Sequence, residues 1–210
     1  LQAELDLFID WFAPQLLGYA VDPALREHFA ALSEVLISSA LTQPQVVVHR
    51  DFHSRNLMCL NNGELAVIDF QDAVIGPITY DPVSLLKDCY VTWPRRRQVA
   101  WLTDYQRLLE ERQLLLPLES AQFIAWFDLM GLQRHIKVLG IFARLALRDG
   151  KRAYLDDLPR VIAYVREVLA LYAQREPALG AFGDYCDTVL LPLCIDQPWY
   201  RDPNTEESQA

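Results

Sequence analysis

The sequence predicts a mainly α-helical protein with a small β element (α+β), and three features of the chain support this fold class. Apolar residues recur every three or four positions over long stretches, which is the spacing of one helix face. Two short apolar runs, 46–48 and 65–68, contain the β-branched residues that are typical of strands. Because 52% of the 210 residues are apolar, the chain can also bury a solid core.

The expected helices follow one another along the chain. Residues 1–16 have one apolar face, and Asp22-Pro23 supplies an N-cap followed by proline at the start of a second helix. Further helices are expected over residues 81–90, 95–116, 119–147, 155–172 and 182–191. Asn61-Asn62-Gly63 is a turn between strands, and Asp149-Gly150 ends the longest helix. Residues from 196 onward have the composition of a surface tail.

Charge and cysteine content exclude several classes of protein. A net charge of −9 and a pI of about 4.9 argue against a general nucleic-acid binder, because an acidic surface repels phosphate backbones. The cysteines lack Cys-x-x-Cys spacing and lie in apolar segments, so we expect buried free thiols and no structural zinc site. They are Cys59, Cys89, Cys186 and Cys194. Without a basic leader or an apolar run of the ~20 residues that span a bilayer, we expect a soluble, cytoplasmic protein with no membrane partner.

The clearest chemical signal is the stretch 46–58, VVVHRDFHSRNLM, which is a strand that runs into a polar loop and then into a second apolar run. Phosphoryl transfer needs a carboxylate that orients and deprotonates the attacking hydroxyl, and an oxygen ligand for the metal on the nucleotide phosphates. Asp51 and Asn56 lie five positions apart in this loop. We therefore expect Asp51 to be the catalytic base and Asn56 to be a metal ligand.

The segment 65–72, LAVIDFQD, places Asp69 at the end of an apolar strand. Mg²⁺ prefers hard oxygen ligands and usually takes one or two protein carboxylates, with phosphate oxygens and water filling its shell. Asp69 is therefore the second expected metal ligand. Asp72 follows three residues later, where it could be a third carboxylate of the site or a turn cap.

The same residues carry a family resemblance. His49-Arg50-Asp51 with Asn56, followed by Asp69-Phe70, resembles the catalytic loop and metal-binding aspartate of the protein-kinase superfamily. His53 and the run IDFQDA are more similar to its aminoglycoside and choline phosphotransferase branch. Within that branch, HRDFHSRNLM, IDFQDAVIGPITYDPVSLLKDCYVTWP and LQRHIKVLGIFARLALRDGK resemble most the bacterial anomeric kinases of N-acetylmuramate and N-acetylglucosamine. Arg50 departs from the aminoglycoside enzymes, which usually carry a small residue there, and so argues against an antibiotic substrate.

The resemblance implies the helical C-terminal lobe of a protein-kinase-like fold over residues 1–175, with a final helix and tail over 176–210. The N-terminal lobe that grips ATP in this superfamily is not visible, so we expect it to be absent from this chain. The resemblance also implies ATP, Mg²⁺ and transfer to the anomeric hydroxyl of N-acetylmuramate or N-acetylglucosamine, as in the recycling of peptidoglycan sugars. A kinase for another small hydroxyl compound, such as an aminoglycoside or a choline-like alcohol, and a pseudokinase-like binding module remain the alternatives.

Residues around the loop have supporting roles in this interpretation. The resemblance implies that His49 braces the loop against the metal-binding segment and that Asp81 supports the loop from below. Asp81 could also cap a helix that begins at Pro82. His53 and Arg55 either face phosphate or substrate or stabilise the loop, and the sequence does not favour one role over the other.

The long helix carries a cluster of basic residues among its apolar ones. Arg134 or His135 could contact an acidic substituent of the sugar, because a carboxylate suits a planar donor. Lys137 and Arg144 lie nearby, and a solvated or salt-bridged face is the commoner outcome for such charges.

Overall fold

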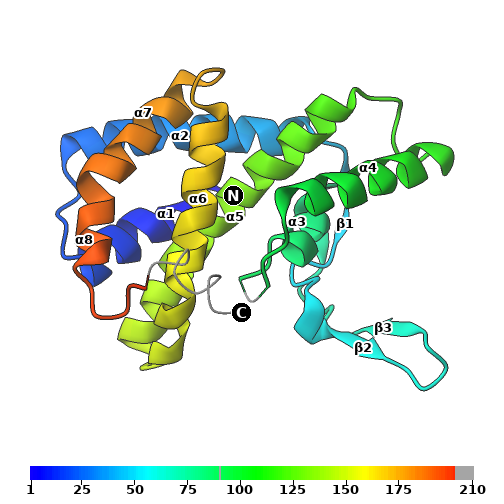
Figure 1. Cartoon of the computed structure of the whole chain (residues 1–210), viewed down its shortest axis with the longest axis horizontal. Helices are drawn as coiled ribbons and strands as arrows, with labels where there is room; N and C mark the ends of the chain where they lie inside the picture. Colours follow the sequence, from blue (N-terminus) through cyan, green and yellow to red (C-terminus); the bar gives the residue numbers. More distant parts are fainter. Residues whose placement is uncertain (90, 202–210) are drawn as a thin grey trace. The chain divides into compact units, whose positions relative to one another are not determined.

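The protein is described by a computed structural model over residues 1–89 and 91–201. Within these ranges helices dominate and strands are few and short, so the predicted mainly α class with a small β element is confirmed (Figure 1). The chain divides into two compact units. Unit 1 comprises Leu1–Ile37 and Leu132–Ala210, and unit 2 comprises Ser38–Gly131.

The N-terminal part of unit 1 is helical, as the apolar periodicity predicts. Helix α1 (Gln2–Leu7) continues into the π-helical segment η1 (Phe8–Leu16). Phe8 stacks on Phe29 at 5.3 Å between ring centroids and meets Phe182 edge-on at 6.0 Å, so these rings join three helices. Helix α2 (Pro23–Thr42) begins after Asp22, whose Oδ1 accepts a hydrogen bond from Leu25 N at 2.7 Å. The predicted cap is confirmed.

The longest helix, α5 (Ser120–Arg148), contributes its C-terminal half to unit 1. Gly140 lies against helix α1, and a Cβ at this position would collide with the backbone of Leu7. The helix ends as predicted, because Gly150 takes a left-handed conformation with φ of +70° and Lys151 N donates to Leu145 O at 3.0 Å.

The remaining helices of unit 1 have different boundaries from those expected. The 3₁₀ turn η3 (Arg152–Asp157) precedes α6 (Leu158–Tyr172), so only the second part of the predicted helix is α-helical. The predicted helix at 182–191 lies inside a continuous helical stretch made of α7 (Pro177–Tyr185), η4 (Cys186–Leu190) and α8 (Leu191–Ile195). Part of the expected tail, residues 202–210, lies outside the described residues.

The helical stretch from α7 to α8 is relevant to the expectation that no apolar run is long enough to span a bilayer. Residues 177–195 form 19 helical residues with a mean hydropathy of 1.3, which is sufficient by length and composition alone. Of the described helices it is the single one that passes, and 28% of it is buried. A lone helix of this kind is weak evidence for a membrane span, because core helices of other proteins meet the same criterion.

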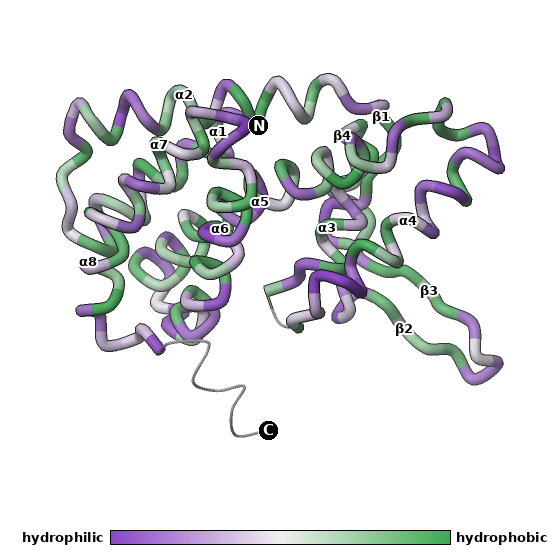
Figure 2. The backbone as a smooth tube through the Cα atoms, turned by 45° about the horizontal axis from the view of Figure 1, so that its top comes forward, coloured by the Kyte–Doolittle hydropathy of each residue, from purple (hydrophilic) through white to green (hydrophobic). Residues whose placement is uncertain are grey.

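The β element belongs to unit 2 and consists of two antiparallel pairs. Strand β1 (Gln45–Val48) pairs with β4 (Val74–Pro77), with Val48 opposite Val74. Strand β2 (Leu57–Cys59) pairs with β3 (Leu65–Val67), with Leu57 opposite Val67. The predicted turn joins the second pair: Gly63 has φ of +82° and Leu60 N donates to Glu64 O at 2.8 Å. This β2–β3 hairpin projects away from the helices of unit 2 (Figure 1) and is largely apolar (Figure 2).

The two remaining helices of unit 2 correct the sequence-based boundaries. Helix α3 (Tyr80–Leu86) begins after Thr79, so Asp81 lies inside its first turn and the expectation that Asp81 caps it is wrong. The helix also ends before residue 90, which lies outside the described residues. Helix α4 (Arg95–Glu111) stops short of residue 116, because Gln113 takes a left-handed conformation with φ of +58° that a helix cannot continue through.

The cysteines are free thiols, as expected, but they differ in exposure. Cys89 and Cys194 are buried, and Cys186 is half-buried. Cys59 is exposed, so its predicted burial is wrong. The reason is its position on β2, because a two-stranded sheet leaves one of its faces in water.

Candidate active site

A single carboxylate holds the start of the loop after β1. Asp81 Oδ2 accepts a hydrogen bond from His49 N at 2.7 Å, and Asp81 Oδ1 accepts one from Arg50 N at 3.0 Å. Ser84 Oγ, one turn further along α3, donates to Arg50 O at 3.1 Å. Helix α3 therefore binds both the backbone N–H and the backbone carbonyl of Arg50. Hydrogen bonds to a charged acceptor are stronger than neutral ones, so this contact fixes the backbone that leads into Asp51.

The loop backbone that α3 binds has an unfavourable conformation. Arg50 has φ of +73°, in the left-handed region. That conformation costs about 1–2 kcal/mol for a residue with a Cβ and persists where surrounding contacts stabilise it. The contacts to Asp81 and Ser84 supply that stabilisation. The bend turns the chain sharply between the end of β1 and Asp51.

Asn56 closes the loop from its other end. Its Nδ2 donates to Asp51 O at 3.0 Å, and the same carbonyl accepts from His53 N at 3.0 Å. Residues 54–56 form a 3₁₀ turn, η2 (Ser54–Asn56), with Asn56 N donating to His53 O at 2.9 Å. Because the amide nitrogen is directed to Asp51, the amide oxygen is the atom that can bind a metal ion.

His49 joins the loop to the segment that carries Asp69. Its Nε2 lies 2.9 Å from Ile68 O, and since a carbonyl accepts hydrogen bonds and cannot donate them, the proton is on Nε2. Ile68 N in turn donates to Asn56 O at 3.1 Å, which extends the β2–β3 ladder by one bond. Asn56 is thereby placed opposite Ile68, the residue before Asp69. These are the contacts that a bracing role for His49 requires, and the role itself stays a prediction.

Asp69 is exposed and has a left-handed backbone with φ of +67°. Gln71 Nε2 donates to its Oδ1 at 2.8 Å, which orients the carboxylate. The Asp69 carboxylate, two residues after β3, and the Asn56 amide oxygen, just before β2, are hard ligands of the kind that suits Mg²⁺. Within the described ranges, no three His, Cys, Asp or Glu side chains gather into a metal-binding group. A cation held by Asn56 and Asp69 would thus complete its shell with phosphate oxygens and water.

Three further candidates lie around this loop. His53 is half-buried and precedes η2, and Arg55 is exposed on that turn. Asp72 is exposed in the turn where Ala73 N donates to Phe70 O at 3.1 Å. The positions of these residues do not test whether they contact a ligand, so the proposed contact of each residue stays a prediction.

The basic candidates on α5 have a different environment. Arg134 and His135 are buried in unit 1, and the His135 ring stacks on Tyr164 with centroids 4.8 Å apart. Lys137 Nζ contacts Glu4 Oε1 at 2.7 Å, and Gln133 Nε2 donates to Glu4 Oε2 at 3.1 Å. The catalytic loop belongs to unit 2. Contact of Arg134 or His135 with a substrate of that loop stays a prediction.

Burial and hydrogen bonding shift the pKa of the Glu4 carboxyl in opposite directions. Burial raises the pKa of its carboxyl, but the charge of Lys137 and the hydrogen bonds from Lys137 and Gln133 lower the pKa by more. The net result is a pKa below the ordinary 4.5. Glu4 is therefore a charged partner of α5 at neutral pH.

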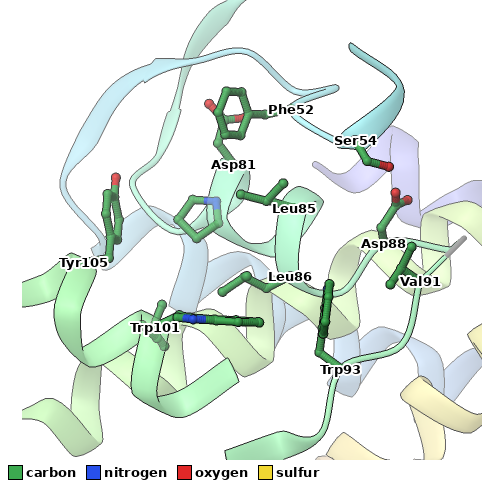
Figure 3. Close-up of a pocket in the computed structure, with 12 residues that line it drawn as sticks. Phe52, Ser54, Asp81, Leu85, Leu86, Asp88, Val91, Trp93, Trp101 and Tyr105 are labelled. Carbon is green, nitrogen blue, oxygen red and sulfur yellow. The ribbon is translucent and has the colours of Figure 1, made fainter. Parts of the chain in front are cut away.

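Beside the loop lies a cavity that the sequence did not reveal. It has a volume of about 630 Å³, and Phe52 and Ser54 of the loop line it together with α3, α4 and the segment between these helices (Figure 3). Trp93 and Trp101 meet edge-on, with ring centroids 5.2 Å apart and an interplanar angle of 86°. Burial, and secondarily the charge of Asp81, raises the pKa of Tyr105, which stays a neutral phenol. Two tryptophans eight residues apart were the only sequence signal.

A buried ion cluster, also missed from the sequence, lies in the same unit. Asp128 of α5 is fully buried, and both of its oxygens accept hydrogen bonds from the Arg95 guanidinium, with Nη2 and Oδ2 2.5 Å apart. Lys87 Nζ, also fully buried, is 3.6 Å from Asp128 Oδ1 and 5.8 Å from the centroid of the Phe127 ring. The cluster ties the end of α3 and the start of α4 to α5.

Comparison with known proteins identifies the family. Residues 3–119, just over half of the chain, match the phosphotransferase enzyme family, APH. The chain belongs to this family. The matched region contains the catalytic loop, the Asp69 segment, Asp81 and every residue that lines the cavity. The predicted resemblance to a small-molecule phosphotransferase branch is confirmed.

Individual relatives are similar to this chain over most of its length. A Pseudomonas putida protein is 44% identical over 184 residues, which cover 88% of this chain and 53% of the relative. A Pseudomonas aeruginosa protein is 42% identical over 184 residues, with the same coverage. A Neisseria meningitidis protein is 42% identical over 174 residues, 83% of this chain and 52% of the relative. Each is named N-acetylmuramate/N-acetylglucosamine kinase. The chain spans about half the length of these curated relatives.

Proposed function

We propose that this phosphotransferase transfers the γ-phosphoryl group of ATP to the anomeric hydroxyl of N-acetylmuramate and N-acetylglucosamine. The observation that carries the proposal is the loop around Asp51, whose backbone is bound by Asp81 before Asp51 and by the Asn56 side chain at Asp51 itself. His49 bonds the same loop to the residue before Asp69. The names of the relatives support the choice of sugar. The described residues would then form the helical C-terminal lobe of a protein-kinase-like fold over 1–175, with 176–201 as its final helical part.

Asp51 has the central role in this proposal. Its carboxylate would accept the proton of the anomeric hydroxyl as that oxygen attacks the γ-phosphorus and the bond to the β–γ bridging oxygen breaks. The proton ends on Asp51 and ADP leaves. Mg²⁺ bound to Asn56 Oδ1 and the Asp69 carboxylate would screen the phosphate charges that build up in the transition state.

The neighbouring residues would position these groups. Asp81 and Ser84 fix the backbone before Asp51, and the Asn56 side chain fixes the carbonyl of Asp51 itself. His49 connects this loop to the residue before Asp69. Positioning of reacting groups accounts for much of the rate in phosphoryl transfer, where the protein does little covalent chemistry.

The test is ADP release by the protein with N-acetylmuramate, N-acetylglucosamine, an aminoglycoside and choline, followed by phosphorus NMR of the product. The proposal expects release with the two amino sugars and coupling of the product phosphorus to the anomeric proton. A phosphate on the 6-hydroxyl would keep the kinase and reject the anomeric assignment. Release with the aminoglycoside or choline alone would reject the sugar.

A further inference from the structure

The cavity beside the catalytic loop, which we call the indole pocket, is placed to receive the phosphate acceptor. Phe52 directly follows Asp51, and Ser54 precedes Asn56 by two residues, so the loop that carries the base is itself one wall. In Figure 3, Phe52 and Ser54 lie on one side and the indoles of Trp93 and Trp101 on the other. Asp51 itself is not one of the lining residues. A general base must lie within hydrogen-bonding distance of the hydroxyl that it deprotonates, so an acceptor in this cavity has to present its hydroxyl at the wall formed by Phe52 and Ser54, next to Asp51 in the loop.

The walls of the indole pocket suit a compact molecule with both apolar and hydroxyl-bearing surfaces. Its volume of about 630 Å³ is in the ordinary range for small-molecule sites, which are mostly apolar with a few polar groups. Trp93 and Trp101 stand at 86° to each other and form a corner of two flat faces. A pyranose ring has an apolar face of C–H groups, and an acetamido group adds a planar amide with a methyl. Both can pack flat on an indole.

Charge limits which part of a sugar can lie inside. The charged side chains that line the indole pocket are Asp81 and Asp88, and none of its described lining residues is basic. A carboxylate transferred into these surroundings would lose its hydration and face negative charge. Sugar hydroxyls can instead donate to carboxylates. The lactyl carboxylate of N-acetylmuramate is therefore disfavoured inside the pocket, while the ring and acetamido group that it shares with N-acetylglucosamine are not.

Members of the buried ion cluster lie close in sequence to residues that line the indole pocket. Arg95, two residues after Trp93, donates two hydrogen bonds to the buried Asp128. Lys87, the residue after the lining residue Leu86, lies 3.6 Å from the same carboxylate. Walls fixed before the ligand arrives reduce the entropy that binding must overcome.

We propose that the indole pocket is the acceptor subsite, in which the N-acetylglucosamine-type ring packs on Trp93 and Trp101 and any lactyl carboxylate projects out of the pocket. This inference rests on the proposed function for the identity of the sugar. It goes beyond that function by assigning the binding surface and by stating which part of the two sugars is recognised there.

The decisive variant is Trp101→Ala, because Trp101 is 39% exposed and its truncation removes a packing face with little effect on the core. The KM for both sugars should rise about tenfold, as expected for loss of an aromatic anchor, while the KM for ATP stays unchanged. The ratio of kcat/KM between the two sugars should stay within about twofold of wild type. Trp101→Phe should recover part of the loss. Leu108→Ala on the same helix, 43% exposed and outside the pocket, is the matched control.

Three outcomes would overturn the subsite. Unchanged KM values in Trp101→Ala would remove the indole from sugar binding while the kinase function stands. A loss confined to N-acetylmuramate would place the lactyl group inside the pocket. A rise in the KM for ATP alone would assign the pocket to the nucleotide.

A titration of tryptophan fluorescence with each sugar, in the absence of nucleotide, separates this inference from the proposed function. Quenching by both sugars that is lost in Trp101→Ala and kept in Leu108→Ala supports the subsite, even if no phosphate is transferred. No quenching in a wild-type protein that phosphorylates both sugars rejects the subsite alone. Absence of both quenching and transfer rejects the subsite together with the function. Circular dichroism of each variant checks that the helices are intact.

Discussion

The catalytic loop of unit 2 and the basic stretch of α5 in unit 1 contain similar residues in opposite settings. Each places a histidine beside an arginine within an apolar stretch, His49-Arg50 in the loop and Arg134-His135 in the helix. The loop lacks a regular backbone partner, so the side chains of Asp81 and Asn56 bind the backbone groups His49 N, Arg50 N and Asp51 O. In the helix the backbone bonds to itself, and side chains such as His135 are used for packing. Residue type alone therefore does not distinguish a site from a core.

The largest effect is expected from Asp69→Ala. Asn56 is neutral and cannot by itself offset the phosphate charge, so transfer should fall below detection at every Mg²⁺ concentration. The measurement is ADP release against Mg²⁺ concentration. Asp72→Ala is the matched control three residues away. A similar loss in the control would assign Asp72 as a third carboxylate of the site and weaken the contrast between the two aspartates.

Asp51→Asn should reduce turnover by about 10²–10⁴, the range typical of a positioned general base, and should leave the fold and the sugar KM nearly unchanged. Asparagine has the same shape but accepts no proton. Asp104→Asn, an exposed aspartate on α4, is the control for charge alone. Single-turnover rates in both variants provide the measurement, and a rate within a few-fold of wild type would exclude Asp51 as the base.

Asp81→Asn should have a smaller effect on turnover, about 10–100-fold, and should also destabilise the protein by about 2 kcal/mol. An asparagine offers one acceptor oxygen, so either His49 N or Arg50 N loses its partner and faces an amide NH₂ group. Urea unfolding and initial rates measure the two effects. If stability falls while the rate does not, the contact holds the fold only and does not position the loop.

The smallest effect is expected from a substitution in unit 1. Glu4→Gln removes the charge that pairs with Lys137, which we expect to cost about 1 kcal/mol at pH 7 with no change in turnover. Because the pKa of Glu4 is lowered in the folded protein, its stabilisation is present above the ordinary value of 4.5 and is lost as the pH falls through the lower folded value. The difference in unfolding free energy between wild type and variant should therefore shrink below pH 4.5. A difference in unfolding free energy that stays constant from pH 7 to pH 3 would contradict the lowered pKa of Glu4.

The sequence determined the features that depend on neighbours along the chain. The strands and turn around the candidate site could be predicted because they follow each other within 46–72. Helices could be predicted where a cap marks the end, as at Asp22 and Gly150. Predicted helix boundaries were wrong where the sequence has no such signal, as at Glu111. A helix end set by a left-handed residue such as Gln113 has no distinct sequence pattern.

The tertiary structure alone decided which distant residues meet. Asp81 reaches His49 across 32 positions, and Arg95 reaches Asp128 across 33, distances over which local periodicity carries no information. The same holds for the indole pocket, where the loop residue Phe52 and Trp101 of α4 line one cavity. Exposure of Cys59 also depended on the partner of its strand, since an apolar run is buried only if something covers it. The candidate catalytic residues could thus be predicted from adjacent positions, whereas the cavity proposed for the substrate is formed only when separate elements pack together.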